Sequence, residues 1–253
     1  MSKNNSPEKL SLFVLCLDQK LDLENIKKNF HFADDIILIG FDFKENFLSD
    51  NIKESFRFID LNTNDKPILD FAKNDIVLLL DSDEEINEDL QDEILKITEK
   101  GFSNTVYSIE REFIFLNKKI KYGAVENNTE VRLFNRKFCS LKDDLPLIGK
   151  VIHKGKTKIL SNKIQNLGYK DFDNYNRKQT TYNYIIAKMH FKKGYKTNAI
   201  KLLSSPFFSF IHQYFIKLGF LDKKEGYILA YIQSFGKLKS QILLWLLTNK
   251  INS

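Results

Sequence analysis

The sequence predicts an α/β protein with a mostly parallel sheet, and three observations lead to this class. Short apolar runs recur along the first 80 residues, which is typical of strands buried on both faces. Segments with helical spacing separate these runs. The chain has 253 residues, of which 43% are hydrophobic, 10 are Gly and 4 are Pro, so it can bury a full core and shows no sign of linkers.

The first half contains the strands that this class requires. Four apolar runs are expected to form strands: residues 10–17, 34–41, 55–61 and 76–80. Residues 22–30 predict a short helix between the first two strands. Residues 68–72 also have helical spacing, and we expect that helix to end at Asn74, because Asn is favoured at helix ends.

The pattern changes after residue 85. Residues 86–100 predict an amphipathic helix that is stopped by Gly101. Paired strands are expected next, at residues 105–123 and 129–138, with turns at Asn117–Lys118 and around Asn127–Asn128. From Asp173 onward the pattern is helical. We therefore expect a first domain over residues 10–172, with a mixed β insert, and a helical C-terminal region over residues 173–253.

Charge divides the chain unevenly. Residues 1–100 carry 12 Lys or Arg against 23 Asp or Glu, whereas residues 101–253 carry 27 against 10, within a net charge of +6. Such a basic second half suits nucleic acid, a phosphorylated substrate or an anionic membrane surface. Nucleic acid is not expected as a partner, because the chain has no zinc-finger spacing, no RNP string and no Gly-rich phosphate loop.

The basic tail is also rich in aromatic residues. Residues 202–216 contain no charged side chain, and residues 241–247 form a short closing apolar run, but neither reaches the roughly 18 residues needed to cross a bilayer. Aromatic and lysine side chains alternate here, which suits helices lying on an anionic membrane. Alternatively, the aromatic rings pack on the first domain and the lysines are solvated. The aromatic residues in question are Phe207, Phe208, Phe210, Tyr214, Phe215, Phe220 and Trp245.

The N-terminus and the cysteines indicate the compartment. The run at residues 10–17 is short and lacks a basic flank and a small-residue cleavage site, so it does not predict a signal sequence. Cys16 and Cys139 are too few for a disulfide framework, and Cys16 lies in an apolar run typical of a buried thiol. We expect a cytoplasmic protein, with the inner face of the cytoplasmic membrane as a second location.

An acidic cluster, Asp81-Ser82-Asp83-Glu84-Glu85, follows the strand at residues 76–80 directly. Ligands bind beyond the carboxyl ends of parallel strands, and two aspartates separated by one residue can hold Mg²⁺ or Mn²⁺ together with diphosphate oxygens. Alternatively, Asp83 caps the next helix, and Glu84 and Glu85 occupy its first turn. The cluster alone leaves both interpretations open.

The context of the cluster resembles a known family. The string "LLLDSDEEI" is similar to the LDADE motif of family 2 glycosyltransferases, in the branch that includes lipopolysaccharide-core β-glucosyltransferases. Further similar strings are "ADDIILI", "YSIEREFIFLNKKIKYG", "VRLFNR" and the stretch over residues 206–231. The resemblance covers about residues 10–240. It implies a nucleotide-diphospho-sugar transferase (GT-A, Rossmann-like) fold.

The resemblance also implies an activity. A protein of this kind is a metal-dependent inverting glycosyltransferase, which moves a sugar from a nucleotide-diphospho-sugar to a bacterial surface glycan or lipid-linked acceptor. Its metal ligands here are Asp81 and Asp83. Its donor-binding candidates are Asp18, Asp42, Lys66, Asp81 and Arg132. For Arg132, a contact with the donor diphosphate and a pairing with a carboxylate of the cluster both remain open, and Lys66 is either a phosphate contact or solvated.

The chain departs from the family pattern at two places. "GFDFKEN" replaces the Asp-x-Gly-Ser-x-Asp string after the second strand, and Asp18 lies where an Asn-Glu pair is usual. Lys154 follows His153 where a Glu is expected, so the base that deprotonates the acceptor is assigned to His153 or Asp144. These departures motivate an alternative: a catalytically decayed transferase fold that acts as a membrane-surface binding or scaffold module.

Overall fold

The structure is a computed structural model that describes residues 8–17, 23–41, 55–63, 66–102, 104–123, 129–142, 150–169 and 172–251. The chain forms two compact units. The first comprises Met1–Glu112 with Asn128–Asn166, and the second comprises Phe113–Asn127 with Leu167–Ser253. The later division lies close to the boundary expected at residue 172. The segment Phe113–Asn127, expected in the first domain, groups with the helices instead.

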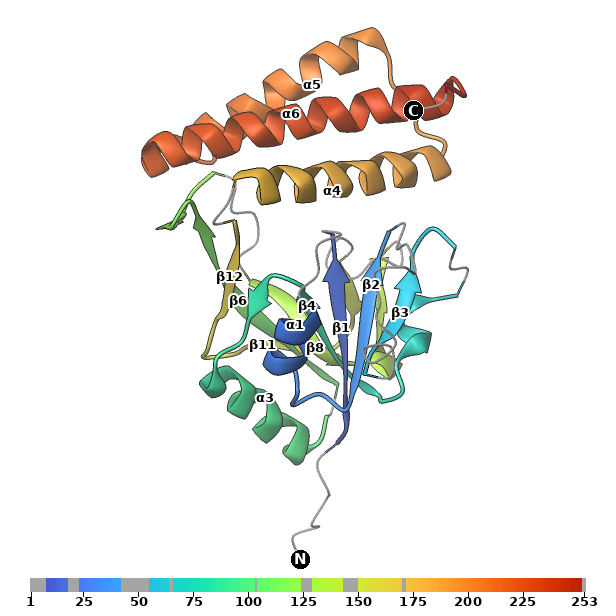
Figure 1. The fold of residues 1–253 in the computed structure, drawn as a ribbon, viewed down its shortest axis with the longest axis vertical. Helices are drawn as coiled ribbons and strands as arrows, with labels where there is room; N and C mark the ends of the chain where they lie inside the picture. The colour runs from blue at the N-terminus through green and yellow to red at the C-terminus, as the bar shows by residue number, and fades with distance from the viewer. Residues whose placement is uncertain are drawn as a thin grey trace, which may run out of the picture. The chain divides into compact units, whose positions relative to one another are not determined.

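The elements of the first unit follow the order β, α, β that the sequence predicts (Figure 1). Its helices are α1 (Leu23–Asn29), the 3₁₀ turn η2 (Ile68–Phe71), α3 (Glu88–Lys100) and the 3₁₀ turn η3 (Arg136–Phe138). Its strands are β1 (Leu10–Cys16), β2 (Asp35–Gly40), β3 (Arg57–Asp60), β4 (Ile76–Asp81), β5 (Glu84–Glu85), β6 (Thr105–Phe115), β8 (Thr129–Asn135), β9 (Cys139–Leu141), β10 (Val151–His153), β11 (Lys156–Ile159) and β12 (Ile164–Tyr169).

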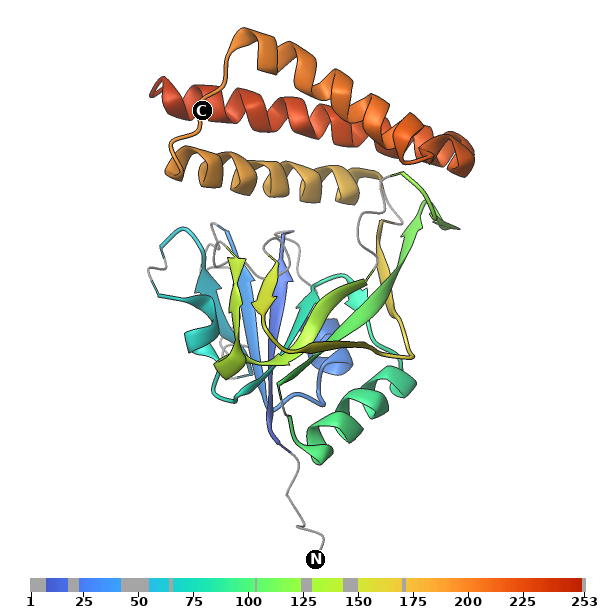
Figure 2. The same ribbon diagram turned by 180° about the vertical axis from the view of Figure 1, so that it is seen from behind.

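The central sheet is mixed rather than mostly parallel. Its strand order among the described residues is β3-β2-β1-β4-β8-β6-β12-β5, and β3, β2, β1 and β4 are parallel (Figures 1 and 2). Beyond β4 the pairs β4–β8 and β8–β6 are antiparallel. The α/β class is therefore confirmed, and the sheet divides into a parallel half and a mixed half.

The strands of the parallel half are buried on both faces, which explains their unbroken apolar runs. Leu12, Val14 and Leu78 point to one face and pack with residues of α1 and α3, such as Ile26 and Leu90, in one core cluster. Residues of the opposite face, including Phe13, Leu15, Val77 and Leu79, are also fully buried. Cys16 is buried, as expected, and both cysteines are free thiols.

Two local predictions are wrong. The helical spacing at residues 68–72 produces only the 3₁₀ turn η2, which ends at Phe71 with Ala72 as C-cap. Asn74 does not end a helix: its backbone N–H donates to the Ser11 hydroxyl, 3.0 Å away. The apolar side chains Ile68 and Leu69 are buried within this single turn.

The second unit is built from α4 (Phe172–Lys192), α5 (Ala199–Ile211), the π-helix η5 (His212–Ile216), the 3₁₀ turn η6 (Gly219–Asp222) and α6 (Lys223–Thr248), with the two-residue strand β7 (Lys118–Lys119). The helical character predicted from Asp173 onward is confirmed. Helix α6 lies between α4 and α5 (Figures 1 and 2). No helix in the described part of the chain is long and apolar enough to span a lipid bilayer.

The tip of the β6–β7 hairpin packs on these helices. Its turn is at Leu116–Asn117, one residue earlier than expected, and both residues have positive φ, as a two-residue type I′ loop requires. The turn expected around Asn127–Asn128 lies outside the described residues. The buried Asp222 carboxylate accepts the backbone N–H of Tyr122 at 2.7 Å. Polar contacts therefore fix the hairpin to the start of α6.

Two glycines of the string "GFLDKKEG" are required by close packing. A Cβ on Gly226 would lie 1.9 Å from the Gly219 carbonyl oxygen, and a Cβ on Gly219 would lie 2.8 Å from the Gln213 carbonyl oxygen. Lys118 also forms an ion pair with the buried Glu225, at 2.7 Å. The part of the chain that most resembles the C-terminal family pattern thus has a structural role in the second unit.

Candidate functional site

The acidic cluster lies at the edge of the sheet where α/β proteins bind ligands. The chain runs from β1 to β2 and β3 on one side of β1, and then places β4 on the other side, so the strand order reverses between β1 and β4. Asp81 is the last residue of β4 and pairs with Leu15 near the carboxyl end of β1. Ligands bind at such a switch point, beyond the carboxyl ends of the strands.

Backbone hydrogen bonds present Asp81 at this edge. The Ser82 N–H donates to the Leu15 carbonyl at 3.0 Å, which extends the pairing of β4 with β1 by one residue. The same N–H lies 3.0 Å from Asp81 Oδ1. Asp81 is buried and Asp83 is half-buried. The turn after β4 therefore places two carboxylates, both largely shielded from solvent, at the carboxyl edge of the sheet.

The alternative in which the cluster starts the next helix is wrong. Helix α3 begins at Glu88, and its N-cap is Asn87, whose side chain accepts the Leu90 N–H at 3.0 Å. Glu84 and Glu85 form the short strand β5, which pairs with β12. Asp83 thus lies in the turn between β4 and β5, several residues before the cap.

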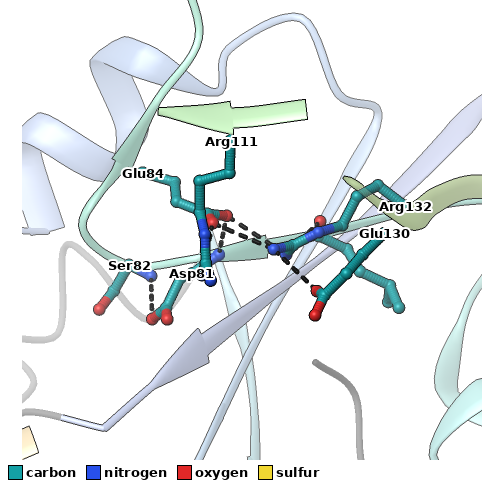
Figure 3. Close-up of polar contacts among 7 residues, drawn as sticks. Asp81, Ser82, Glu84, Arg111, Glu130 and Arg132 are labelled. Atoms are coloured by element: carbon teal, nitrogen blue, oxygen red, sulfur yellow. Dashed lines mark hydrogen bonds and ion pairs between the residues drawn. The ribbon is translucent and has the colours of Figure 1, made fainter. Parts of the chain in front are cut away.

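Glu84 is the centre of a buried ion-pair network (Figure 3). It is 1% exposed, and its carboxylate receives both Arg132 Nη atoms, at 3.1 Å to Oε1 and 3.3 Å to Oε2. Arg111 Nη1 lies 3.6 Å from Oε1, and the Asp81 backbone N–H donates to Oε2 at 2.8 Å. Glu84 therefore ties the turn that carries Asp81 to strands β6 and β8.

Arg132 takes the second of the two roles left open for it. Its side chain is 2% exposed and, besides Glu84, pairs with Glu130 at 3.2 Å and donates to the Leu79 carbonyl at 3.4 Å. A buried guanidinium needs such partners to offset the loss of hydration. Pairing with a cluster carboxylate is thus confirmed for Arg132, and a contact with a donor phosphate stays a prediction.

The charges of the site leave an excess of negative charge. Asp81, Asp83, Glu84 and Glu130 contribute four carboxylates, and Arg111 and Arg132 contribute two guanidinium groups. No group of three or more His, Cys, Asp or Glu among the described residues has the geometry to hold a metal ion. Mg²⁺ is commonly held by one or two carboxylates together with substrate phosphates and waters, and the hard oxygen donors of Asp81 and Asp83 fit that mode.

His153 lies on a different element. It ends β10, which pairs only with β9 in a separate two-stranded sheet of the described chain, and its register partner is Cys139. Its Nδ1 lies 3.2 Å from the Gly155 carbonyl, a geometry in which Nδ1–H donates and Nε2 can accept a proton.

The neighbouring strand β9 carries Cys139. Burial raises the pKa of the Cys139 thiol to about 11, so this thiol is protonated at neutral pH.

The remaining predicted residues are dispersed or lie outside the described ranges. Lys66 is exposed in the segment before η2. Asp18, Asp42 and Asp144 lie outside the described residues, so their positions relative to Asp81 stay predictions. The structure brings Asp81, Asp83 and Arg132 into one site and leaves His153 on another sheet.

Sequence reasoning missed Glu84 and Arg111 as parts of the site. Glu84 was interpreted as a residue of the helix start, and Arg111 was not distinguished within β6. One signal was present: Arg111 and Arg132 are both charged residues within predicted strands, where a buried charge requires a partner. No family model matches the chain.

Proposed function

We propose that this protein is a metal-dependent inverting glycosyltransferase of the GT-A type, which moves a sugar from a nucleotide-diphospho-sugar to a surface glycan or lipid-linked acceptor. The observation that carries the proposal is the placement of Asp81 and Asp83 at the carboxyl end of β4, where the strand order reverses. The similarity of "LLLDSDEEI" to the LDADE motif of family 2 glycosyltransferases supports the same assignment.

In this proposal, Asp81 and Asp83 hold Mg²⁺ or Mn²⁺. The bound cation would offset the charge that develops on the departing nucleoside diphosphate. A divalent cation between the two aspartates and the donor would screen the repulsion between these carboxylates and the diphosphate oxygens. Glu84, held by Arg111 and Arg132, keeps the turn in place, so the two aspartates do not need to reorganise when the donor binds.

The acceptor hydroxyl must lose a proton as it attacks the anomeric carbon. We assign this step to His153 or Asp144. The Nδ1 contact of His153 with the Gly155 carbonyl leaves Nε2 as the ring atom that can take the proton. Loss of sugar transfer in His153→Gln, with metal-dependent donor binding retained, would support His153 over Asp144.

A donor screen tests the proposal directly. The full chain is incubated with UDP-, GDP- or dTDP-sugars, an acceptor extract and Mn²⁺ or Mg²⁺, and nucleotide release is measured. We expect release with one donor class, its loss with EDTA and its recovery when metal is restored. Asp83→Asn should lower the rate at least about a hundredfold, because metal stabilisation of the leaving group contributes several kcal/mol.

Asp89→Asn is the matched control for this variant. Asp89 is an exposed aspartate in the first turn of α3, outside the cluster, so the same chemical change there should leave the rate unchanged. Equal rates for wild type and Asp83→Asn would contradict the metal assignment. Absence of release with every donor class would contradict the glycosyltransferase proposal itself.

The second candidate is a decayed transferase fold that binds without catalysis. The observation that favours it is Lys154, which is exposed directly after His153 where the family pattern has an acidic residue. Such a protein acts as a membrane-surface binding or scaffold module. Calorimetric titration with nucleotide-diphospho-sugars and Mn²⁺ separates the two candidates, because a pure scaffold should show no metal-dependent binding.

A further inference from the structure

Helix α5 exposes an apolar face that no described residue of the second unit covers. No residue of α5 is buried. Ile200, Leu203 and Phe207 are 75%, 76% and 62% exposed, and their spacing of three and four residues places them on one side of the helix. Soluble proteins rarely expose large contiguous apolar patches, and those that do use them for binding.

Exposed apolar residues also follow α5 directly in the chain. Phe215 and Ile216 of η5 and Phe220 and Leu221 of η6 are all exposed. Ring contacts hold the aromatic side chains in place: the Phe207 ring packs edge-on against Phe208, with 5.9 Å between centroids. We call the exposed apolar residues of α5, η5 and η6 the α5 face; they are Ile200, Leu203, Phe207, Phe208, Phe215, Ile216, Phe220 and Leu221.

The surface around the α5 face is positive. From residue 174 to residue 253 the sequence has thirteen Lys or Arg and only two acidic residues, Asp222 and Glu225. Both acidic side chains are buried, Asp222 against backbone N–H groups and Glu225 against Lys118. The described part of this segment therefore exposes lysines and no carboxylate side chain. Lys201 on α5 and Lys224 at the start of α6 are both exposed.

An apolar, aromatic face bordered by lysines complements one kind of surface in particular. Aromatic rings favour the boundary between headgroups and acyl chains, and each lysine near an anionic bilayer adds electrostatic attraction. A second copy of the chain would instead bring the same lysines together, which opposes association. Since no described helix can span the bilayer, the contact has to lie in the plane of the interface.

We propose that the α5 face docks on an anionic lipid bilayer, with α5 lying along the interface and the surrounding lysines over the headgroups. The apolar side chains of α5 would enter the outer part of the acyl region. This inference does not depend on glycosyl transfer, so it stands or fails independently of the proposed activity. It places the protein at a membrane surface.

The test is co-sedimentation of the full chain with vesicles. Wild-type protein should bind vesicles of phosphatidylcholine with 30% phosphatidylglycerol and release as salt is raised, because screening weakens the lysine contribution. The variant Leu203→Glu/Phe207→Glu should lower the partition coefficient about a hundredfold, since each fully buried side chain of this type contributes roughly tenfold. Phe138→Glu, at an exposed phenylalanine of the first unit, is the matched control and should bind like wild type.

A charge variant keeps the test independent of folding. Lys201→Glu/Lys224→Glu alters two exposed side chains and leaves the apolar face intact, and it should weaken binding to the anionic vesicles about tenfold or more. Equal binding of wild type and both variants would overturn the proposal. A second outcome would also overturn it: the wild-type chain does not bind vesicles, and sedimentation equilibrium shows a dimer that dissociates in the Phe207→Glu variant.

Discussion

Carboxylates lie at both ends of the same parallel strands, and the two sets are used differently. At the amino end, Asp35 starts β2 and accepts hydrogen bonds from the Ser11 hydroxyl at 2.8 Å, the Lys73 N–H at 3.1 Å and the Arg57 guanidinium. At the carboxyl end, Asp81 accepts from the next residue in the chain, while the two arginines are held by Glu84.

The two edges of the sheet thus use aspartates differently. Asp35 joins neighbouring strands, whereas Asp81 and Asp83 lie at the end of β4 and in the turn that follows it. Asp35 links β1, β3 and the segment before β4, so its charge is balanced within the fold. At the other edge, Glu84 pairs with Arg111 and Arg132, and the turn that Glu84 holds carries Asp81 and Asp83 at the carboxyl end of β4. A cluster of carboxylates is thus a better candidate for a ligand site when the neighbouring arginines pair with another acidic residue, as Arg111 and Arg132 do with Glu84.

The largest expected effect comes from breaking the buried network at the carboxyl edge. Arg132→Met removes the closest cationic partner of Glu84 and leaves a carboxylate buried without its main ion pair. We expect the free energy of unfolding to fall by about 3–5 kcal/mol, measured by urea denaturation. The double variant Glu84→Gln/Arg132→Met should recover part of this loss. A cost below about 1 kcal/mol would show that the network does not hold the turn.

An intermediate effect is expected at the amino edge. Asp35→Asn gives up charge-assisted hydrogen bonds from three elements and should cost about 1–3 kcal/mol of unfolding free energy, measured by urea denaturation at neutral pH. Asp34→Asn is the control, because Asp34 is exposed and accepts one backbone hydrogen bond, from Leu10 at 2.8 Å. A larger loss for Asp34→Asn than for Asp35→Asn would contradict the role given to Asp35.

The same pair of variants tests the pH dependence. Burial raises the pKa of Asp35, but the hydrogen bonds from Arg57, the Lys73 N–H and Ser11 outweigh it and hold the pKa below its ordinary value of 3.8. The contribution of Asp35 is therefore complete above pH 3.8 and is lost as the pH falls through the lower, folded pKa. The stability difference between wild type and Asp35→Asn should shrink on acidification, and a constant difference would contradict this.

The smallest effect on stability is expected for a change at Asp81, a residue that is central to the proposed function. Asp81→Asn keeps an oxygen that can accept the Ser82 N–H and removes one charge from an acidic turn, so the free energy of unfolding should change by no more than about 1 kcal/mol. Metal-dependent donor binding, measured by calorimetry, should be lost in the same variant. A destabilisation as large as that of Asp35→Asn would make Asp81 a structural residue instead.

The fold was predictable where apolar pattern alone decides it. The runs at residues 10–17, 34–41, 55–61 and 76–80 all contain strands, and the helix after the cluster forms close to its predicted range. The prediction for residues 68–72 differs from the structure because one 3₁₀ turn over Ile68–Phe71 already buries Ile68 and Leu69, so the apolar spacing does not fix the length of the element.

The site was predictable only in part, because its residues depend on partners far away in the sequence. The sequence predicted Asp81 and Asp83 at the end of a strand. An apolar run followed by carboxylates indicates a strand end whichever neighbouring strands it pairs with. It did not identify Glu84 as the residue that holds the turn, because its partner Arg132 lies 48 residues further along and meets it only through the pairing of β8 with β4.

By itself, then, the sequence determined the α/β class, the parallel strands and the position of the acidic turn, because these follow from local hydrophobic pattern. The tertiary structure decided which buried acidic residues form ion pairs, as Asp35 and Glu84 do, and which lie at the end of β4 and in the turn after it, as Asp81 and Asp83 do. It also decided that Phe207 and Phe208 of α5 are exposed while Asp222 and Glu225 are buried. Burial and ion pairing are properties of the packed chain, and they assign different roles to residues of identical type.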